Sequence, residues 1–212
     1  NFGGAFTNIL NSTISGNSTL TSFGGAMQAN GTVTVTNSTI SGNNSSTSGG
    51  GIYFNGTALT LINSTVTNNT TSGGGGGVFR TGTNPFNVRN SIIAGNNVGT
   101  TAPDFSGPAT SQGYNLVGKT DGSTGFTEPT DLTGTIAAPL DPMLGALANN
   151  GGPTMTHALL TGSPAIDKGS AANNPITTLP IITDQRNLVR PVDIPAIPNA
   201  AGGNGSDIGS FE

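Results

Sequence analysis

Short runs in which apolar and polar residues alternate recur through the first half of the chain. One such run occurs four times, and the asparagines that begin its copies are spaced by 26, 26 and 27 residues: Asn11-Ser-Thr-Ile-Ser-Gly-Asn17, Asn37-Ser-Thr-Ile-Ser-Gly-Asn43, Asn63-Ser-Thr-Val-Thr-Asn-Asn69 and Asn90-Ser-Ile-Ile-Ala-Gly-Asn96. Alternation with a period of two is typical of a β-strand with one buried face. Self-similarity at this longer period is typical of a solenoid whose coils stack strand on strand.

Two further short runs recur with the same period as the first. A Gly-Gly run recurs as Gly24-Gly-Ala-Met27, Gly50-Gly-Ile-Tyr53 and Gly76-Gly-Val-Phe79, and a β-branched run recurs as Thr32-Val-Thr-Val-Thr36 and Ala58-Leu-Thr-Leu-Ile62. Each period therefore contains three short strands separated by Gly and Asn corners. The pattern predicts an all-β, right-handed parallel β-helix with three strands per coil and a period of about 26 residues.

The alternation assigns a direction to each side chain of the repeat. It places one apolar residue per coil in an interior column, beside an inward serine and an outward threonine, and this core column is Ile14, Ile40, Val66 and Ile93. The first asparagine of each copy lies at a corner, where an amide tolerates a left-handed backbone and can hydrogen-bond the amide of the next coil. We therefore predict a structural ladder of Asn11, Asn37, Asn63 and Asn90.

Many of these asparagines also begin Asn-x-Ser/Thr triplets, which are acceptors for N-linked glycans. A glycan acceptor must be exposed, whereas an asparagine within a ladder cannot carry a sugar. Because the chain is rich in Asn, Ser and Thr, the triplet also arises by composition alone. We favour the structural interpretation, with corner-loop triplets such as those at Asn44 and Asn69 as the exceptions.

The second half of the chain has a different composition and lacks the repeat. The repeat fades after Asn97, most of the 13 prolines follow it, and proline cannot donate to a strand ladder. We predict β-helix coils over residues 1–120 and an irregular cap or flanking segment over residues 121–212, within one continuous structural unit. Because residue 1 enters in mid-coil, we also expect sequence upstream of it.

Charge is distributed as unevenly as proline. No charged residue precedes Arg80, and all ten acidic residues lie at Asp104 or beyond. A nearly neutral rod lacks the clustered Lys and Arg that nucleic acids and anionic membrane surfaces require. It also resists self-association only weakly. No apolar run reaches the length of a membrane span, so we expect neither a nucleic-acid partner nor membrane insertion by this chain.

Three ordered motifs in the second half carry a family resemblance. They are the run from Asp141-Pro-Met-Leu-Gly to Ala165-Ile-Asp-Lys-Gly169, then Thr183-Asp-Gln-Arg186 followed by Arg190-Pro191, and finally Asp207-Ile-Gly-Ser-Phe-Glu212. Together they resemble the carboxyl-terminal module of the bacterial choice-of-anchor Q proteins. The runs Gly24-Gly-Ala-Met27 and Ile40-Ser-Gly-Asn43 resemble the Gly-Gly-Ala-Ile and Phe-x-x-Asn motifs of polymorphic outer-membrane proteins, with Ile in place of Phe. The first resemblance implies a secreted or surface-displayed bacterial β-helix, and neither family supplies a catalytic motif.

Parallel β-helices also include polysaccharide lyases and hydrolases. Their chemistry needs several carboxylates on one strand face beside an Arg or Lys. The predicted coils carry no carboxylate before Asp104, which favours a protein without catalytic residues or a cofactor. A carbohydrate-active or carbohydrate-binding β-helix is the alternative.

The charged residues of the second half have two interpretations. The first is a set of cap ion pairs formed by Asp184, Arg186, Arg190 and Asp207, with Asp167 as a further partner, because buried charges need partners. The second is a calcium site formed by Asp167, Asp184 and Asp207. The only histidine, His157, is better explained as a packed strand residue than as a metal ligand, since it has no companion.

The functional expectation is an extracellular or cell-surface structural or adhesive solenoid. Self-association through the ends of the β-helix would make it a protomer of a head-to-tail fibre, because a β-helix end exposes unpaired strand edges. A surface glycan or a host matrix component is a further expected partner. Ice binding through outward threonine columns such as Thr13, Thr39 and Thr65 is a minor alternative.

Overall fold

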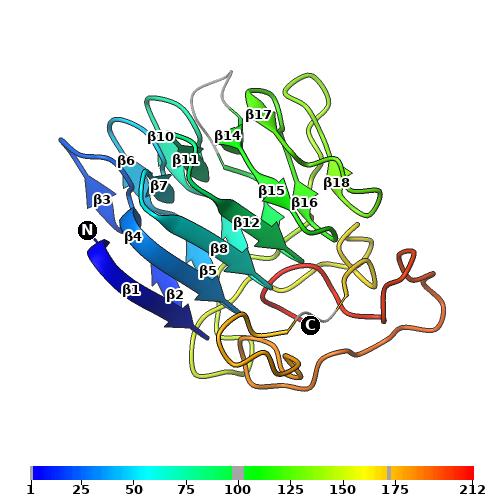
Figure 1. Cartoon of the computed structure of the whole chain (residues 1–212). Helices are drawn as coiled ribbons and strands as arrows, with labels where there is room; N and C mark the ends of the chain where they lie inside the picture. Colours follow the sequence, from blue (N-terminus) through cyan, green and yellow to red (C-terminus); the bar gives the residue numbers. More distant parts are fainter. Residues whose placement is uncertain (1, 97–102, 171–172) are drawn as a thin grey trace.

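The computed structural model describes residues 2–96, 103–170 and 173–212, with side chains described from Phe6 onward. The described residues contain strands and no α-helix, and the strands form a parallel β-helix of about four turns (Figure 1). The register advances by 26 residues in the first coils, as in the pairs Thr13 with Thr39 and Thr39 with Thr65, and by 27 from Thr65 to Ile92. The predicted fold class is confirmed.

The described strands form three parallel sheets. The first sheet contains β1 (Phe2–Leu10), β4 (Met27–Thr36), β7 (Ile52–Phe54), β8 (Ala58–Ile62), β11 (Val78–Arg80), β12 (Phe86–Arg89), β14 (Phe105–Pro108), β15 (Thr110–Ser111) and β17 (Ser123–Thr124). The second contains β2 (Thr13–Ser15), β5 (Thr39–Ser41), β9 (Thr65–Thr67), β13 (Ile92–Ile93), β16 (Leu116–Val117) and β18 (Leu132–Thr133). The third contains β3 (Ser18–Thr19), β6 (Asn44–Ser45) and β10 (Thr70–Thr71).

The three sheets do not correspond one to one to the three recurring runs of the sequence. The Gly-Gly run and the β-branched run lie on the same sheet, because the continuous strand β4 pairs with β7 through Met27–Ala29 and with β8 through Thr32–Thr36. The third face comes from the residues just after the repeated run, in strands of only two residues each. Strands this short carry too few alternating positions to show a period in the sequence.

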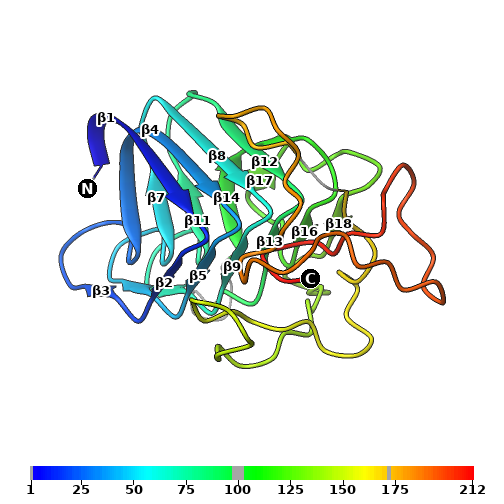
Figure 2. The ribbon, with the colours of Figure 1, turned by 90° about the horizontal axis from the view of Figure 1, so that it is seen from below.

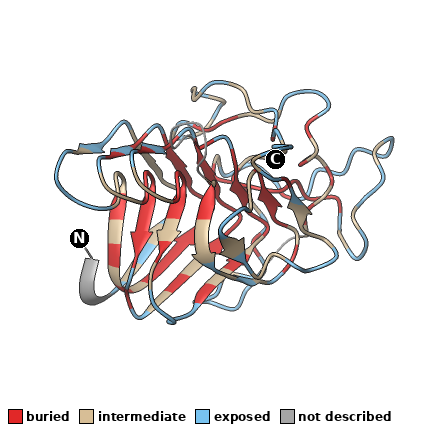
Figure 3. Ribbon diagram, turned by 90° about the horizontal axis from the view of Figure 1, so that it is seen from above, coloured by how far each residue is buried: buried red, intermediate tan, exposed pale blue. Residues whose placement is uncertain are grey.

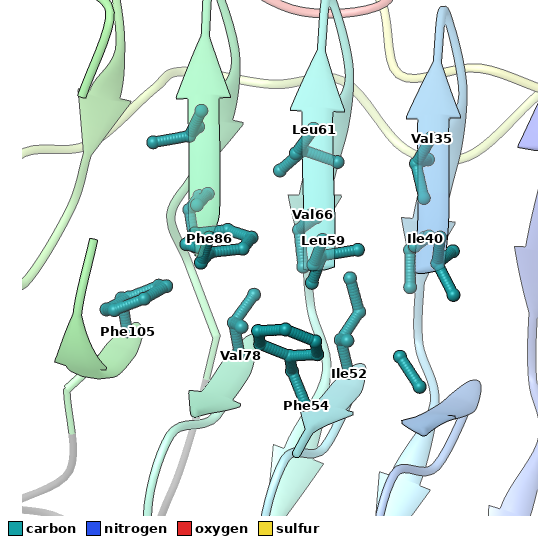
Figure 4. Packing of buried hydrophobic residues seen from close by; sticks show 14 of the residues in the cluster. Val35, Ile40, Ile52, Phe54, Leu59, Leu61, Val66, Val78, Phe86 and Phe105 are labelled. Carbon is teal, nitrogen blue, oxygen red and sulfur yellow. The ribbon is translucent and has the colours of Figure 1, made fainter. Parts of the chain in front are cut away.

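The core is a narrow apolar column inside the coils (Figure 4). Ile14 pairs in register with Ile40, Ile40 with Val66, and Val66 with Ile93. The last three are completely buried, whereas Ile14 in the first coil is partly exposed. Beside this column the rings of Phe54, Phe86 and Phe105 follow one another along the axis, with centroids 6.5 and 5.1 Å apart.

The chain from residue 141 onward runs back along the flank of the solenoid (Figures 1 and 2). We call residues 141–170 and 173–212 the strap. Strand pairing with the coils continues as far as Thr133, in β18. The strap covers the outer face of the second sheet, where Ile92, Ala94 and Leu116 form an apolar cluster with Ala165 and Ile208. Buried residues therefore lie on both sides of this sheet, whereas most corner loops are exposed (Figure 3).

The strap accounts for the burial of the outward threonines. Thr39 Oγ1 lies 2.6 Å from Gln185 Oε1 and 2.9 Å from Ser210 Oγ. Thr65 Oγ1 accepts a hydrogen bond from the amide N–H of Ser210. These threonines point away from the coil interior, as predicted, but they are buried beneath the strap. This column therefore gives no support to ice binding.

The core column generates a test of the coil model. Ile40→Ala should lower the free energy of unfolding by about 2–5 kcal/mol, because it leaves a cavity between two stacked coils. Ile14→Ala should cost clearly less, since Ile14 packs against one neighbouring coil and is partly exposed. Urea unfolding followed by circular dichroism measures both. Equal losses for the two variants would contradict the column.

Candidate functional site

Both corners that flank the second sheet are built from polar side chains. At the first corner Asn11, Asn37, Asn63 and Asn90 all adopt the left-handed backbone conformation, with φ of 47, 44, 47 and 48°. Asn90 Nδ2 donates to Asn63 Oδ1 over 3.1 Å, as the predicted ladder requires. Asn11 and Asn37, however, donate to the strap, at Asn187 Oδ1 and the carbonyl oxygen of Thr183. This column therefore sets the turn and anchors the strap, and it is not a continuous ladder.

The continuous asparagine ladder lies at the second corner, at Asn17, Asn43, Asn69 and Asn96. Oδ1 of Asn43, Asn69 and Asn96 each accepts two hydrogen bonds from the preceding asparagine, one from its backbone N–H and one from its Nδ2, over 2.9–3.0 Å. Nδ2 of Asn69 also donates to the carbonyl oxygens of Ile40 and Thr67. The interior position of Asn69, which is fully buried, corrects its assignment as an exposed glycan acceptor.

A backbone difference decides which asparagine enters the ladder. At the second corner the preceding residue takes the left-handed conformation, with φ of 67° at Gly16, 67° at Gly42, 56° at Asn68 and 68° at Gly95. Glycine adopts this conformation without steric cost, so the asparagine that follows is free to turn its amide inward. At the first corner the asparagine itself occupies the left-handed position. The sequence signal for the ladder is the Gly-Asn pair, which by itself predicts only a corner.

A second ladder runs through the serines that follow the first corner. The backbone N–H of Ser12 donates to Ser38 Oγ, that of Ser38 to Ser64 Oγ, and that of Ser64 to Ser91 Oγ, over 3.1–3.2 Å. Each described Oγ in turn donates to the carbonyl oxygen two residues earlier, as Ser64 does to Ile62. The backbone N–H of Ser91 then donates to Asn115 Oδ1, which continues the column into the next coil.

Both ladders end on an aspartate. Asp104 Oδ1 accepts the N–H and Nδ2 of Asn96 over 2.6 and 3.1 Å, and Asp131 Oδ1 accepts the N–H and Nδ2 of Asn115 over 3.1 and 3.0 Å. An ionised carboxylate only accepts hydrogen bonds, so it completes a column of donors without needing an acceptor in a further coil. The outer oxygen of each carboxylate, Oδ2, is buried and accepts no hydrogen bond from the described residues.

Asp104 is the more enclosed of the two ladder ends. It is completely buried, and burial raises the pKa of its carboxyl from 3.8 to about 6. The two donors of Asn96 and the positive charge of Lys119 act in the opposite direction on this pKa. Lys119 Nζ itself donates to the carbonyl oxygen of Asn96 over 2.8 Å.

Three of the four charged residues predicted to form cap ion pairs do so, in two pairs. Arg186 Nε lies 2.7 Å from Asp184 Oδ2, and Arg190 Nε lies 2.7 Å from Glu212 Oε2. The prediction is wrong for Asp207, which takes part in neither pair, because Glu212 at the end of the same motif occupies Arg190. The carboxylate of Asp207 accepts the backbone N–H of Asp167. Burial raises the pKa of Asp207 to about 7, and the neighbouring Glu212 carboxylate adds to this shift.

The three aspartates considered for calcium have other partners. Asp184 accepts hydrogen bonds from Arg186 and from the backbone N–H of Leu188, while Asp167 faces the backbone N–H of Ile194. In the part of the chain that the structure describes, no three His, Cys, Asp or Glu residues are grouped so that they could hold a metal ion. Asp167, Asp184 and Asp207 therefore serve as anchors of the strap.

His157 is buried between the strap and the second sheet. Its Nδ1 lies 2.7 Å from the carbonyl oxygen of Gly145, and its Nε2 lies 2.8 Å from Ser41 Oγ. A carbonyl only accepts hydrogen bonds, so Nδ1 carries the proton and Nε2 accepts from the serine hydroxyl. Burial lowers the pKa of this imidazole, which is consistent with its neutral form. With both residues buried, the pair fastens the strap to β5.

Comparison with known proteins adds no identity to this description. A scan of protein-family models, a search of curated proteins and a search of solved structures each gave no match to the chain. The described residues include no helix with the length and hydrophobicity that a membrane span requires. What the structure establishes is the class: an all-β, parallel β-solenoid protein.

The asparagine ladder predicts a large effect at one buried position. Asn69→Ala removes the buried acceptor of the backbone N–H and Nδ2 of Asn43, together with the hydrogen bonds that Asn69 Nδ2 donates to Asn96 and to Ile40, so it should cost about 3 kcal/mol of stability. The adjacent exposed residue provides the control, because Thr70→Ala removes one surface hydrogen bond to Asn44. Chemical unfolding of both variants measures the difference, and similar losses would refute the ladder.

The ladder end predicts a pH dependence of stability. Burial raises the pKa of Asp104 from its ordinary value of 3.8 to about 6, so the folded state binds this proton more tightly than the unfolded chain does. The resulting stabilisation is complete below pH 3.8 and is lost as the pH rises through 6. Asp104→Asn should therefore become more stable relative to the wild type between pH 4 and pH 8, by up to about 3 kcal/mol. Urea unfolding across this range tests the difference, in which the contribution of Asp207 cancels. A constant difference would contradict the prediction.

Proposed function

We propose that this chain is a non-enzymatic structural or adhesive β-solenoid displayed outside the cell, as its resemblance to the choice-of-anchor Q proteins implies. The observation that carries the proposal is that the recurring polar side chains hydrogen-bond to the next coil. The Ser and Asn that recur in each coil point inward and hydrogen-bond to the next coil, as Ser64 and Asn69 do. Such residues build a rod and leave its surface nearly uncharged.

The strap supports a non-catalytic role. Hydrolysis or lyase chemistry on polysaccharides needs carboxylates that face a bound sugar. The carboxylates of Asp184 and Glu212 are instead held by Arg186 and Arg190, and that of Asp207 by the backbone of Asp167. These groups fasten the chain to its own flank, which favours a structural use of the fold.

The first coil supplies the surface for the self-association that we propose. Strand β1 pairs with β4 alone, β2 with β5 alone and β3 with β6 alone, so each described first-coil strand has one unpaired edge. An open strand edge is a template for pairing with another chain. Apolar side chains border it, because Phe6, Leu10 and Leu20 are 61, 45 and 82% exposed. A second protomer that continues the coils would bury this edge, and so would a coil that precedes residue 1 in the same polypeptide.

Self-association can be tested by charging the open edge. The wild type should show concentration-dependent association in multi-angle light scattering, with filaments in electron micrographs at high concentration. Leu20→Asp should weaken it, because a carboxylate at the contact would be desolvated without a partner. Leu160→Asp, at an exposed leucine of the strap, is the matched control and should associate like the wild type. A strictly monomeric wild type would count against the assembly.

A further inference from the structure

We propose that the surface through which two copies of this chain associate continues from the first coil onto the strap. A cleft of about 250 Å³ joins the two parts, because Leu10 of the first coil lines it together with Leu179 and Ile182 of the strap. We call these three side chains the rim. The inference rests on the self-association proposed above, and it assigns the strap a part in the contact with the second copy.

Two hydrogen bonds fix the strap beside the first two coils. Asn11 Nδ2 in the first coil donates to Asn187 Oδ1 over 3.1 Å, and Asn37 Nδ2 in the second coil donates to the carbonyl oxygen of Thr183 over 2.9 Å. Thr183 in turn forms an antiparallel bridge with Val189, so this segment of the strap is held in a tight hairpin. The hairpin is therefore a fixed wall at the first-coil end of the solenoid.

The side chains of the rim are exposed to solvent. Ile181 is buried against Ile62 of β8, whereas the next residue, Ile182, is 68% exposed. Leu179 is 65% exposed, and Leu10 on the coil side of the cleft is 45% exposed. Single exposed apolar residues are common on soluble proteins, but a group of them around one cleft is typical of an interaction surface. The rim therefore extends the apolar edge of the first coil.

The sequence on both sides of the cleft is uncharged. No charged residue precedes Arg80, and none lies between Asn173 and Thr183. Nucleic acids and anionic membranes are bound by clustered Lys and Arg, so this surface does not suit them. An apolar and uncharged surface of another protein chain does suit it, because the burial of apolar area needs no charged partner.

A second copy of this chain is the occupant that fits both parts of the surface. It would continue the parallel coils on the open edges of β1, β2 and β3. Because the strap flanks the second sheet at the level of the first coil, a copy stacked on that coil would also lie against the rim. β2 and β3 have only three and two residues, whereas a stable interface buries roughly 800 Å² on each partner. The rim adds apolar area that these short edges do not supply.

Alkylation of single cysteines tests the contact on the full chain. The sequence contains no cysteine, so each introduced thiol is the only one. Ile182→Cys probes the rim, Leu20→Cys probes the first coil, and Leu160→Cys, at an exposed position of the strap, is the control. In concentrated, associated protein the first two thiols should react with N-ethylmaleimide about tenfold more slowly than in dilute protein, because a covered thiol is not accessible. The rate for Leu160→Cys should not change.

The outcomes separate this inference from the proposed function. Protection of Leu20→Cys without protection of Ile182→Cys would overturn the contact at the rim and leave self-association through the first coil in place. Protection of neither thiol, with a monomeric mass in light scattering, would contradict both. Protection of all three thiols would indicate nonspecific aggregation and would overturn the rim as well. Protection of Ile182→Cys by phosphatidylcholine vesicles in dilute protein, and not by raised protein concentration, would replace the second copy with a lipid surface.

Two substitutions at Ile182 separate the contact from folding. Ile182→Asp should raise the dissociation constant of self-association at least about tenfold, because the second copy would desolvate a carboxylate without a partner. Ile182→Val keeps an apolar side chain and should associate like the wild type. Because Ile182 is exposed, both variants should keep the wild-type midpoint of urea unfolding in dilute protein. Unchanged association of Ile182→Asp would contradict the inference.

Discussion

Every coil of this solenoid must place a side chain of the same kind directly beside its counterpart in the next coil. The constraint comes from the parallel backbone pairing, in which Thr13, Thr39 and Thr65 are consecutive partners in register. An amide or a hydroxyl repeated at this spacing meets its own copy and can donate to it and accept from it. A chain with few charged and few large apolar residues thereby obtains polar columns that are hydrogen-bonded from coil to coil.

The ladders also have a direction. The donors of Asn43 point to Asn69, those of Asn69 point to Asn96, and those of Asn96 point to Asp104. A column of this kind needs a residue at its end that accepts without donating, and aspartate meets the need in both ladders. Burial at the end of the column also raises the pKa of the Asp104 carboxyl. The ladder end is thus a structural requirement that places an ionisable group inside the coils.

The repeat determined the fold in advance, because period, alternation and corner residues all indicated stacked parallel strands. The inward placement of Ile40 and Val66 followed from the same alternation. The choice between Asn63 and Asn69 as the ladder residue did not follow, since it depends on whether the asparagine itself or the residue before it takes the left-handed conformation. The path of the strap was equally hidden, because its contacts are single residues such as Gln185, Ser210 and Glu212 without a repeating pattern.

The strap changes how a repeat protein of this kind unfolds. In an uncapped solenoid each coil touches only its neighbours, so terminal coils can fray one at a time. Here Asn11 in the first coil bonds Asn187 across 176 residues, and Asn90 in a later coil bonds the carbonyl oxygen of Asp207. Because both coils bind the strap, detaching one of them from the strap also weakens the contacts between the strap and the other coil. The strap therefore couples local openings into one cooperative transition, and it protects the first coils against the stepwise proteolysis that fraying would permit.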